Sequence, residues 1–353
     1  MISSRLMELV RCPDCGGRLQ GQVPDLACGS CARRFAANAD YLVLHPGVTF
    51  AEQTKYLDQS LHADARHEHV TPPLLSAKIR NDILRSFLQL RPGDLCIDLG
   101  CGSGRTLVWN ADSGADLVGI DVSPYFAREA CDGVDLVLGD LRRLPFADGA
   151  FTKGCALDVV EHVSREGLVE VLREAGRVMA PGGAVFVYSH VRKNSWVAGG
   201  LKGVNRFARW LERRDLVDLS RERLRKSDHL NPLADIPDLD EVVSAAGFRI
   251  AKIRYYTPLV GAVVENILVR MGEHWLAKRA ARRAAAAGRG IDANAAAREA
   301  RTAAKARASQ GSAVRVALLA VTWLMKLDIL LFGRVRSCPF FVLLVKEDGS
   351  RAA

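Results

Sequence analysis

The sequence lacks a hydrophobic run long enough to span a membrane, since the uncharged core of its apolar segment 312–335 is only Val316–Met325. A spanning helix needs roughly twenty apolar residues. The residues before the first cysteine pair also lack the apolar stretch of an export signal. Prolines are few, 13 in 353 residues, and 49% of residues are hydrophobic, which argues against a disordered chain. We therefore expect a cytoplasmic globular protein with one large domain and attachments, or two domains.

The net charge of +9 is unevenly spread along the chain. Segment 192–228 holds eleven Lys and Arg against five Asp and Glu, and segment 276–310 holds nine against two. These two segments together exceed the total charge, so the rest of the chain is mildly acidic. This pattern predicts a local anionic partner for the two cationic segments.

Four of the nine cysteines have the spacing of a metal site, Cys12-x2-Cys15 and Cys28-x2-Cys31. In a reducing compartment such pairs indicate metal before disulfide. Four thiolates complete a tetrahedral shell, so we expect structural zinc at Cys12, Cys15, Cys28 and Cys31. Residues 11–46 resemble the zinc ribbon that precedes some bacterial methyltransferases, including the 23S ribosomal RNA guanine methyltransferases. Those typically end in a histidine ligand, where this chain has Cys31.

A glycine-rich loop follows the apolar stretch Leu95–Leu99, with the spacing G-x-G-x-G. Position 105 is Arg, so the G-x-G-x-x-G spacing of dinucleotide sites is absent, and no G-K-[ST] follows for a triphosphate. Asp98 precedes the first glycine. Its carboxylate would repel a pyrophosphate but would favour a sulfonium ligand that carries an ammonium group.

Acidic residues also stand at the ends of the following predicted strands. Asp121 lies about twenty residues after the loop, the spacing at which an acid binds ribose hydroxyls in doubly wound folds. Asp140 ends a third strand, Asp158 lies near the end of a fourth, and a fifth follows the Pro-Gly-Gly turn and ends at His190. Open α/β sheets bind ligands at this edge, so the acids predict a binding site rather than mere strand caps.

Residues 93–190 resemble the class I S-adenosylmethionine-dependent methyltransferases, most closely the branch of ubiquinone and menaquinone biosynthesis. The resemblance implies an α/β fold with a Rossmann-like sheet of seven strands, the last antiparallel, with strands six and seven at 248–256 and 339–348. It implies that Asp98 and the glycines hold the amino-acid end of the cofactor, that Asp121 and Val122 bind ribose and flank adenine, and that Asp140 and Leu141 contact adenine. The full set of implied cofactor-binding residues is Asp98, Gly100, Cys101, Gly102, Gly104, Asp121, Val122, Asp140, Leu141 and Asp158.

Methyl transfer is an in-line displacement that needs alignment and a dry site more than covalent catalysis. Cys101 therefore needs no chemical role and is expected to pack. A hydroxyl acceptor would benefit from a base, and the catalytic candidates are His162, His190 and His229, with Asp158 beside them. If the turn at 158–162 is helical, its acids and His162 could hold a divalent ion, although a helix N-terminus that favours acids explains them more simply.

The expected organisation is a zinc ribbon at 1–47, helices that cover the cofactor at 48–92, and a methyltransferase core at 93–256. The core contains a substrate lid at 191–235, with Trp196, Phe207, Trp210 and Leu211 among arginines. A basic amphipathic helical insertion follows at 257–338, and the last strand and tail occupy 339–353.

Two apolar segments of the insertion predict contact with an anionic membrane surface. Segment 258–276 carries one helical stripe. In segment 312–335, Arg315, Thr322 and Lys326 fall on one narrow helical face that Leu319 interrupts, while Asp328 lies off that face. Packing against the sheet or against a dimer partner is the alternative. The members of the first stripe are Val260, Val263, Val264, Ile267, Leu268, Met271 and Trp275.

The sequence thus predicts a methyltransferase that acts on an oxygen or carbon of a hydrophobic, lipid-linked or anionic small molecule. Its expected location is the inner face of the cell membrane. The alternative is an RNA nucleobase methyltransferase whose zinc ribbon and basic segments bind phosphates. Against this, the fourth strand ends "LDVVEHV", without the Asn/Asp-Pro-Pro-aromatic signature of many amino-group nucleobase enzymes. The acceptor and the oligomeric state stay open.

Overall fold

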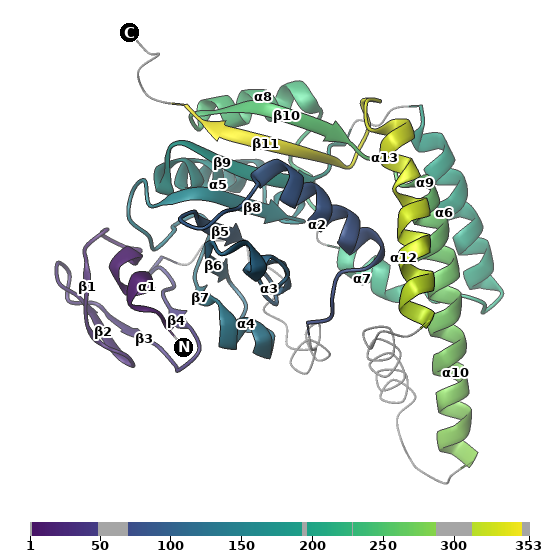
Figure 1. Cartoon of the computed structure of the whole chain (residues 1–353), viewed down its shortest axis with the longest axis horizontal. Coiled ribbons are helices and arrows are strands. Elements are labelled where there is room, and N and C mark those ends of the chain that lie inside the picture. Colours follow the sequence, from purple (N-terminus) through teal and green to yellow (C-terminus); the bar gives the residue numbers. More distant parts are fainter. Residues whose placement is uncertain (1, 49–69, 193–195, 228, 287–312, 348–353) are drawn as a thin grey trace.

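The computed structural model describes residues 2–48, 70–192, 196–227, 229–286 and 313–347, and their centre is a mixed β-sheet (Figure 1). The described sheet has eight strands in the order β10-β11-β9-β8-β5-β6-β7-β4. Only β11 runs antiparallel to its neighbours, as expected for the last strand. The strands are β4 (Leu42–Val43), β5 (Leu95–Leu99), β6 (Asp116–Asp121), β7 (Asp135–Leu138), β8 (Phe151–Leu157), β9 (Met179–Ser189), β10 (Phe248–Tyr255) and β11 (Phe340–Lys346).

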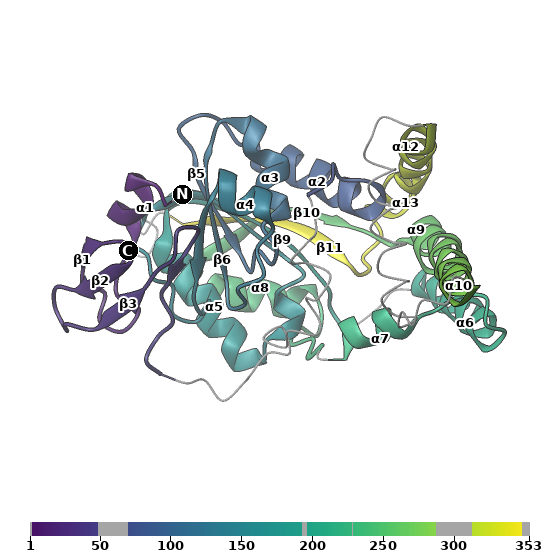
Figure 2. The same cartoon turned by 90° about the horizontal axis from the view of Figure 1, so that it is seen from below.

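Helices cover both faces of this sheet (Figure 2), which explains why the central strands are continuously apolar. All five residues of β5 are buried. One face carries α5 (Arg165–Val178), which Ser164 caps by accepting a hydrogen bond from Gly167 N, and α8 (Ile236–Ala245). The other face carries α2 (Leu75–Leu88), α3 (Arg105–Asn110) with the short η3 (Ala111–Ser113), and α4 (Arg128–Gly133). The fold class predicted from the sequence is confirmed.

The eighth strand, which the sequence did not predict, belongs to the N-terminal ribbon. β4 pairs in parallel with β7, and Leu44 N donates a hydrogen bond of 2.7 Å to Leu138 O. Leu6, Val10 and Phe35 of the ribbon lie in the same hydrophobic core as the sheet. The ribbon therefore packs as part of the main domain rather than as an independent module. Its other elements are α1 (Ser4–Leu9) and a three-stranded sheet of β1 (Leu19–Gln22), β2 (Asp25–Cys28) and β3 (Arg34–Ala36).

A layer of helices stands at the end of the molecule opposite the ribbon, as both views show (Figures 1 and 2). It combines the connections that follow β9 and β10, and the two meet in an apolar cluster that includes Leu211 and Ile267. Among the described residues, no helix has the length and apolar character to span a membrane. The layer comprises α6 (Ala198–Arg213), α7 (Ser220–Lys226), α9 (Leu259–Val263), the π-helical turn η5 (Val264–Val269), α10 (Arg270–Ala286), α12 (Ala313–Met325) and α13 (Leu327–Phe332).

Three polar residues of segment 312–335 contact the protein rather than solvent alone. Thr322 is buried, and its hydroxyl accepts a hydrogen bond from Leu75 N of α2. Lys326 pairs with Asp82 of α2 at 2.8 Å. Asp328, which the helical pattern left unexplained, is fully buried and accepts hydrogen bonds from the first backbone N–H groups of α9. One face of α12 thus packs against the protein, as the alternative to membrane contact predicted, while the opposite face of the helix is exposed.

The expected helices at 48–92 are described in part. Residues 49–69 lie outside the described residues, as does most of the alanine- and arginine-rich stretch, 287–312. α2 lies over β9 and β11, where Phe87 contacts Phe186 edge to face. It therefore reaches the sheet edge at which the site is expected.

Candidate cofactor and acceptor site

The glycine loop after β5 adopts the backbone geometry that only glycine accepts easily. Gly100, Gly102 and Gly104 have φ of 76°, 54° and 77°. A Cβ on Gly100 would lie 2.6 Å from Val159 Cγ2, and one on Gly104 would lie 2.6 Å from Ala130 Cβ. The loop is thus packed tightly between the segment after β8 and α4. Cys101 is buried within it, in agreement with a packing role.

Two acids meet at this loop. Asp98 is only 2% exposed, and burial together with the charge of Asp121 raises its pKa to about 7, although the Cys155 thiol donates to it. Asp121 accepts hydrogen bonds from Gly102 N at 2.8 Å and from the backbone and hydroxyl of Ser123. Asp121 thus holds the loop, and Asp98 is buried beside it with a raised pKa. A positively charged ligand at this position would stabilise both.

The adenine-side residues lie after β6 and β7. Val122 and Leu141 are half-buried, so each offers an apolar surface beside the loop. Asp140 already has a partner that the sequence analysis missed, because Arg142 donates to both of its carboxylate oxygens, at 2.9 and 2.7 Å. Their contact with adenine stays a prediction.

Asp158 follows β8 in a left-handed conformation, with φ of 57°, which is strained for a non-glycine residue. Its carboxylate forms an ion pair with Arg80 of α2, and the Arg80 guanidinium lies 5.2 Å from the centre of the Tyr188 ring. The next residues form only the 3-10 turn η4 (Val160–His162). The interpretation of Asp158, Glu161 and His162 as one helical face is therefore wrong. Arg80 was missed because it lies 78 positions from its partner.

The three candidate histidines come together from three separate segments. The rings of His162 and His229 meet edge to face with centroids 4.7 Å apart, and His190 lies 6.5 Å from His229. Glu161 lies beside them, with Oε1 at 3.4 Å from His190 Nδ1. One ligand atom each from Glu161, His162 and His229 lies within 4.8 Å of the others, which is close enough for the three side chains to hold a divalent ion.

The four ribbon cysteines converge as their spacing predicts. All four Sγ atoms lie within 4.8 Å of one another, with Cys12–Cys31 at 3.7 Å and Cys15–Cys28 at 3.5 Å. A tetrahedral zinc with bonds of about 2.3 Å would place sulfurs about 3.8 Å apart. Backbone N–H groups of Cys31 and Ser30 lower the pKa of Cys28 to about 6, which favours the thiolate. The donor set fits zinc.

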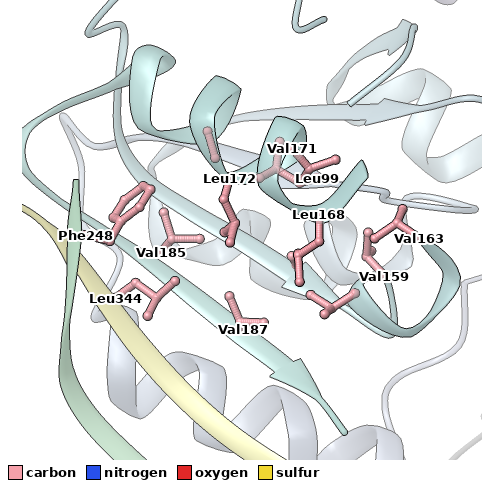
Figure 3. Close-up of a pocket in the computed structure, with 13 residues that line it drawn as sticks. Leu99, Val159, Val163, Leu168, Val171, Leu172, Val185, Val187, Phe248 and Leu344 are labelled. Carbon is pink, nitrogen blue, oxygen red and sulfur yellow. The ribbon is translucent and has the colours of Figure 1, made fainter. Parts of the chain in front are cut away.

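A separate apolar cavity lies between α5 and the strands β8 and β9 (Figure 3). Its lining includes Val159, Leu168, Val185 and Phe248, and no polar side chain contributes to it. It offers no hydrogen-bonding group to a cofactor, and it lies beneath the strand ends where the acids and histidines gather. We assign it to the core.

A family model described as "Methyltransferase domain" matches residues 97–187, which include the glycine loop, Asp121, Asp140 and Asp158. Residues 97–187 are therefore similar to a methyltransferase domain. The match agrees with the type of domain that the sequence predicted for these residues. It leaves the ribbon and the helical layer outside the matched residues.

Three relatives are similar to parts of this chain. Sterol 4-C-methyltransferase strm-1 of Caenorhabditis elegans is 28% identical over 36% of this chain and 42% of its own length. A ubiquinone biosynthesis O-methyltransferase of Azorhizobium caulinodans is 34% identical over 41% of this chain and 62% of its own length. A probable tRNA methyltransferase 9B of Mus musculus is 36% identical over 30% of this chain and 24% of its own length. The matches thus span about a quarter to three fifths of these relatives.

Replacing Asp121 with alanine is expected to weaken binding of S-adenosylhomocysteine by about 10- to 100-fold, because a carboxylate hydrogen bond contributes about 1.5–3 kcal/mol. The loss combines the ribose contact with the hydrogen bond that holds Gly102. Calorimetric titration measures it. Asp116→Ala, at the exposed far end of the same strand, is the matched control. Unchanged affinity in Asp121→Ala, with the fold intact by circular dichroism, would contradict the assignment.

Proposed function

We propose that this chain is an S-adenosylmethionine-dependent methyltransferase that acts on an oxygen or carbon of a hydrophobic, lipid-linked or anionic small molecule. We place this reaction at the inner face of the cell membrane. The observation that carries the proposal is an exposed apolar surface on the helical layer next to the site. α6 follows β9, α9 follows β10, and α13 precedes the antiparallel β11, so all three attach at the carboxyl edge of the parallel strands.

Large apolar side chains are exposed on each helix of this layer, which we call the apolar surface. Trp196, before α6, is 86% exposed. Each main helix also presents a tryptophan with a cation over its ring, Arg214 at Trp210, Arg279 at Trp275 and Lys326 at Trp323. Aromatic rings next to cations suit the boundary of an anionic bilayer. The other members are Phe207, Val263, Leu268, Met271, Val314, Val316, Leu324, Leu327, Leu330 and Leu331.

The names of the relatives support a hydrophobic acceptor. Two of them are a sterol methyltransferase and an enzyme of ubiquinone biosynthesis, and a squalene methyltransferase of Botryococcus braunii is also similar to this chain. Such acceptors reside in membranes, so an enzyme that uses them benefits from a surface that enters the bilayer boundary. The probable tRNA methyltransferase instead favours the second candidate, an RNA nucleobase enzyme.

The proposed cofactors are S-adenosylmethionine at the glycine loop and structural zinc at the four cysteines. The methyl donor would be held by this chain through Asp98, Asp121 and the loop backbone. Zinc would serve folding, because four protein ligands leave no open position. Both assignments rest on the residues that the structure brings together.

Membrane binding is expected to depend on exposed leucines rather than on the fold. The variant Leu327→Glu/Leu330→Glu/Leu331→Glu should sediment with vesicles that contain phosphatidylglycerol at least about tenfold less than the wild type, because three apolar anchors become anionic. Point changes are preferable to deleting 312–335, since that deletion would remove the buried Asp328. Val48→Glu, on the ribbon side, is the matched control.

Labelled methyl transfer decides between the two candidates. Tritiated S-adenosylmethionine is incubated with the zinc-loaded chain and either a membrane-lipid extract or total RNA. Label in the lipid extract, lost in the triple-glutamate variant, supports the proposal. Label in RNA, together with salt-sensitive RNA binding, would establish the second candidate instead.

A further inference from the structure

We propose that Glu161 is a positioning residue that orients His190 as a general base, so that the acceptor atom is one that loses a proton. This inference rests on the proposed function and narrows its acceptor to a hydroxyl oxygen or an acidic carbon. A neutral amine can attack with its free electron pair and needs no base at that step. The sequence analysis assigned Glu161 no role in proton transfer.

Glu161 is a buried carboxylate, 1% exposed, at the edge where the site lies. Burial alone would raise its pKa, but the contacts with His190 and Ser189 outweigh burial and hold that pKa below the usual glutamate value. Ser189 Oγ donates a hydrogen bond of 2.7 Å to Oε2, and Oε1 faces His190 Nδ1. A buried ionised group is costly unless it is partnered, so its contacts indicate a specific task.

Glu161 also contacts or adjoins each of the three segments that carry the histidines. Glu161 precedes His162 in the chain, and its carboxylate faces His190. Its backbone carbonyl accepts hydrogen bonds from Leu230 N at 2.8 Å and Asn231 N at 3.2 Å, which anchors the segment that carries His229. Glu161 therefore links η4 to the end of β9 and to the loop that follows α7.

His190 is oriented as a base would be. Its Nδ1 atom is buried and has no hydrogen-bond partner within the described ranges, while Glu161 Oε1 lies 3.4 Å from it. The side chain as a whole is 33% exposed. A proton on Nδ1 directed at Glu161 would leave Nε2 as the proton acceptor.

The sheet order brings this base close to the cofactor loop. His190 follows β9, Val159 follows β8, and the loop follows β5, and these three strands are neighbours. Val159 closely packs against Gly100, so the segments after β8 and β5 touch. A ligand that fills the loop would present its methyl group at this same edge.

The proposed step balances in atoms and charge. Nε2 of His190 takes the proton of the acceptor O–H or C–H while the freed electron pair forms the bond to the methyl carbon. The bond between carbon and sulfur breaks with its electrons on sulfur, which turns the sulfonium into a neutral thioether. The proton stays on His190, where the Glu161 carboxylate balances its charge, and then passes to solvent.

The tautomer of His190 tests this role without knowledge of the acceptor. Long-range proton–nitrogen spectra are recorded on the zinc-loaded full chain with 15N-labelled histidine and S-adenosylhomocysteine bound. The wild type should show His190 with its proton on Nδ1, assigned by loss of the signal in His190→Gln. Glu161→Leu should lose this signal and Glu161→Asp should keep it. Glu166→Leu, an exposed change at the start of α5, is the matched control.

A second readout is methyl transfer from tritiated S-adenosylmethionine to the lipid extract. Glu161→Leu should lower the rate by about 10- to 100-fold, part of the 10²–10⁴-fold typical of general base catalysis, with recovery in Glu161→Asp. An Nδ1 proton unaffected by Glu161→Leu would overturn the inference. So would Mg²⁺ shifting the nitrogens of His162 and His229, because the group would then be a metal site. Failure of the proposed function differs, as the wild type itself would then transfer no label to the lipid extract, whereas the tautomer of His190 could still be read in each variant.

Discussion

Replacing Asp98 with asparagine is expected to weaken S-adenosylmethionine binding by about 100-fold, or about 2.7 kcal/mol, within the range for a hydrogen bond to a charged group. The residue stands at the end of β5, buried and close to Asp121. Asparagine keeps its shape but cannot become negative, so the attraction to a cationic ligand is lost. Calorimetric titration measures the change, with Asp132→Asn on the exposed surface of α4 as the control.

The same residue predicts how binding depends on pH. The pKa of Asp98 is about 7, because burial and Asp121 disfavour its charge. A cationic ligand favours the charged form, so binding near pH 7 releases a proton. The affinity should rise about tenfold from pH 6 to pH 8, as the ionised fraction grows from about a tenth to about nine tenths. Titration in two buffers of different ionisation heat measures the released proton, and a pH-independent affinity would contradict the assignment.

The free energy of unfolding of the protein without added ligand should instead fall as the pH rises. The folded pKa of Asp98 lies above the value of about 4 in the unfolded chain, so the folded state holds a proton that the unfolded chain releases. The stabilisation that this proton gives to the folded state is complete below about pH 4, and it is lost as the pH rises through about 7. Asp98→Asn should remove that part of the pH dependence.

The sequence predicted the strand edge well because its signals are local. The run Leu95–Leu99 followed by three glycines requires both a buried strand and left-handed turns, and the structure has both. Asp121 and Asp140 each stand within a few residues of a strand end, so their common edge follows from parallel pairing alone. The cysteine cluster is likewise encoded in two short spacings.

Contacts between distant segments could not be read in the same way. The pairing of Arg80 with Asp158 and of Asp328 with α9 joins parts of the chain separated by more than sixty positions. β4 has only two residues, too few to show an alternating pattern. The apolar stripe of 258–276 was predicted as one helix, but the structure has the π-helical turn η5 within it, and of its members Ile267 is buried while Leu268 is exposed.

The ribbon carries a structural consequence for the site. Arg11 N donates to Pro145 O, and Ala147 N donates to Leu9 O, so the chain on both sides of Phe146 is fixed by the ribbon. β4 covers the edge of β7, the strand that leads to Asp140 and Leu141. A Cβ on Gly139 would lie 3.4 Å from Leu44 O, which shows how closely the two segments approach. The side of the site at which adenine is predicted to bind is therefore built on the ribbon.

Replacing two of the proposed zinc ligands is expected both to unfold the ribbon and to weaken cofactor binding. Structural zinc contributes about 10–16 kcal/mol of apparent binding energy to small metal modules, so the double variant Cys28→Ser/Cys31→Ser should lose the folded ribbon. The uncovered edge of β7 should then lower the melting temperature of the whole chain by about 10 °C or more and S-adenosylhomocysteine affinity by about tenfold. Scanning calorimetry, titration and zinc analysis measure these quantities, with Cys131→Ser, outside the cluster, as the control. Because the ribbon shares its core with the sheet, a variant that lost zinc but kept both melting temperature and affinity would show that the metal is dispensable for this edge.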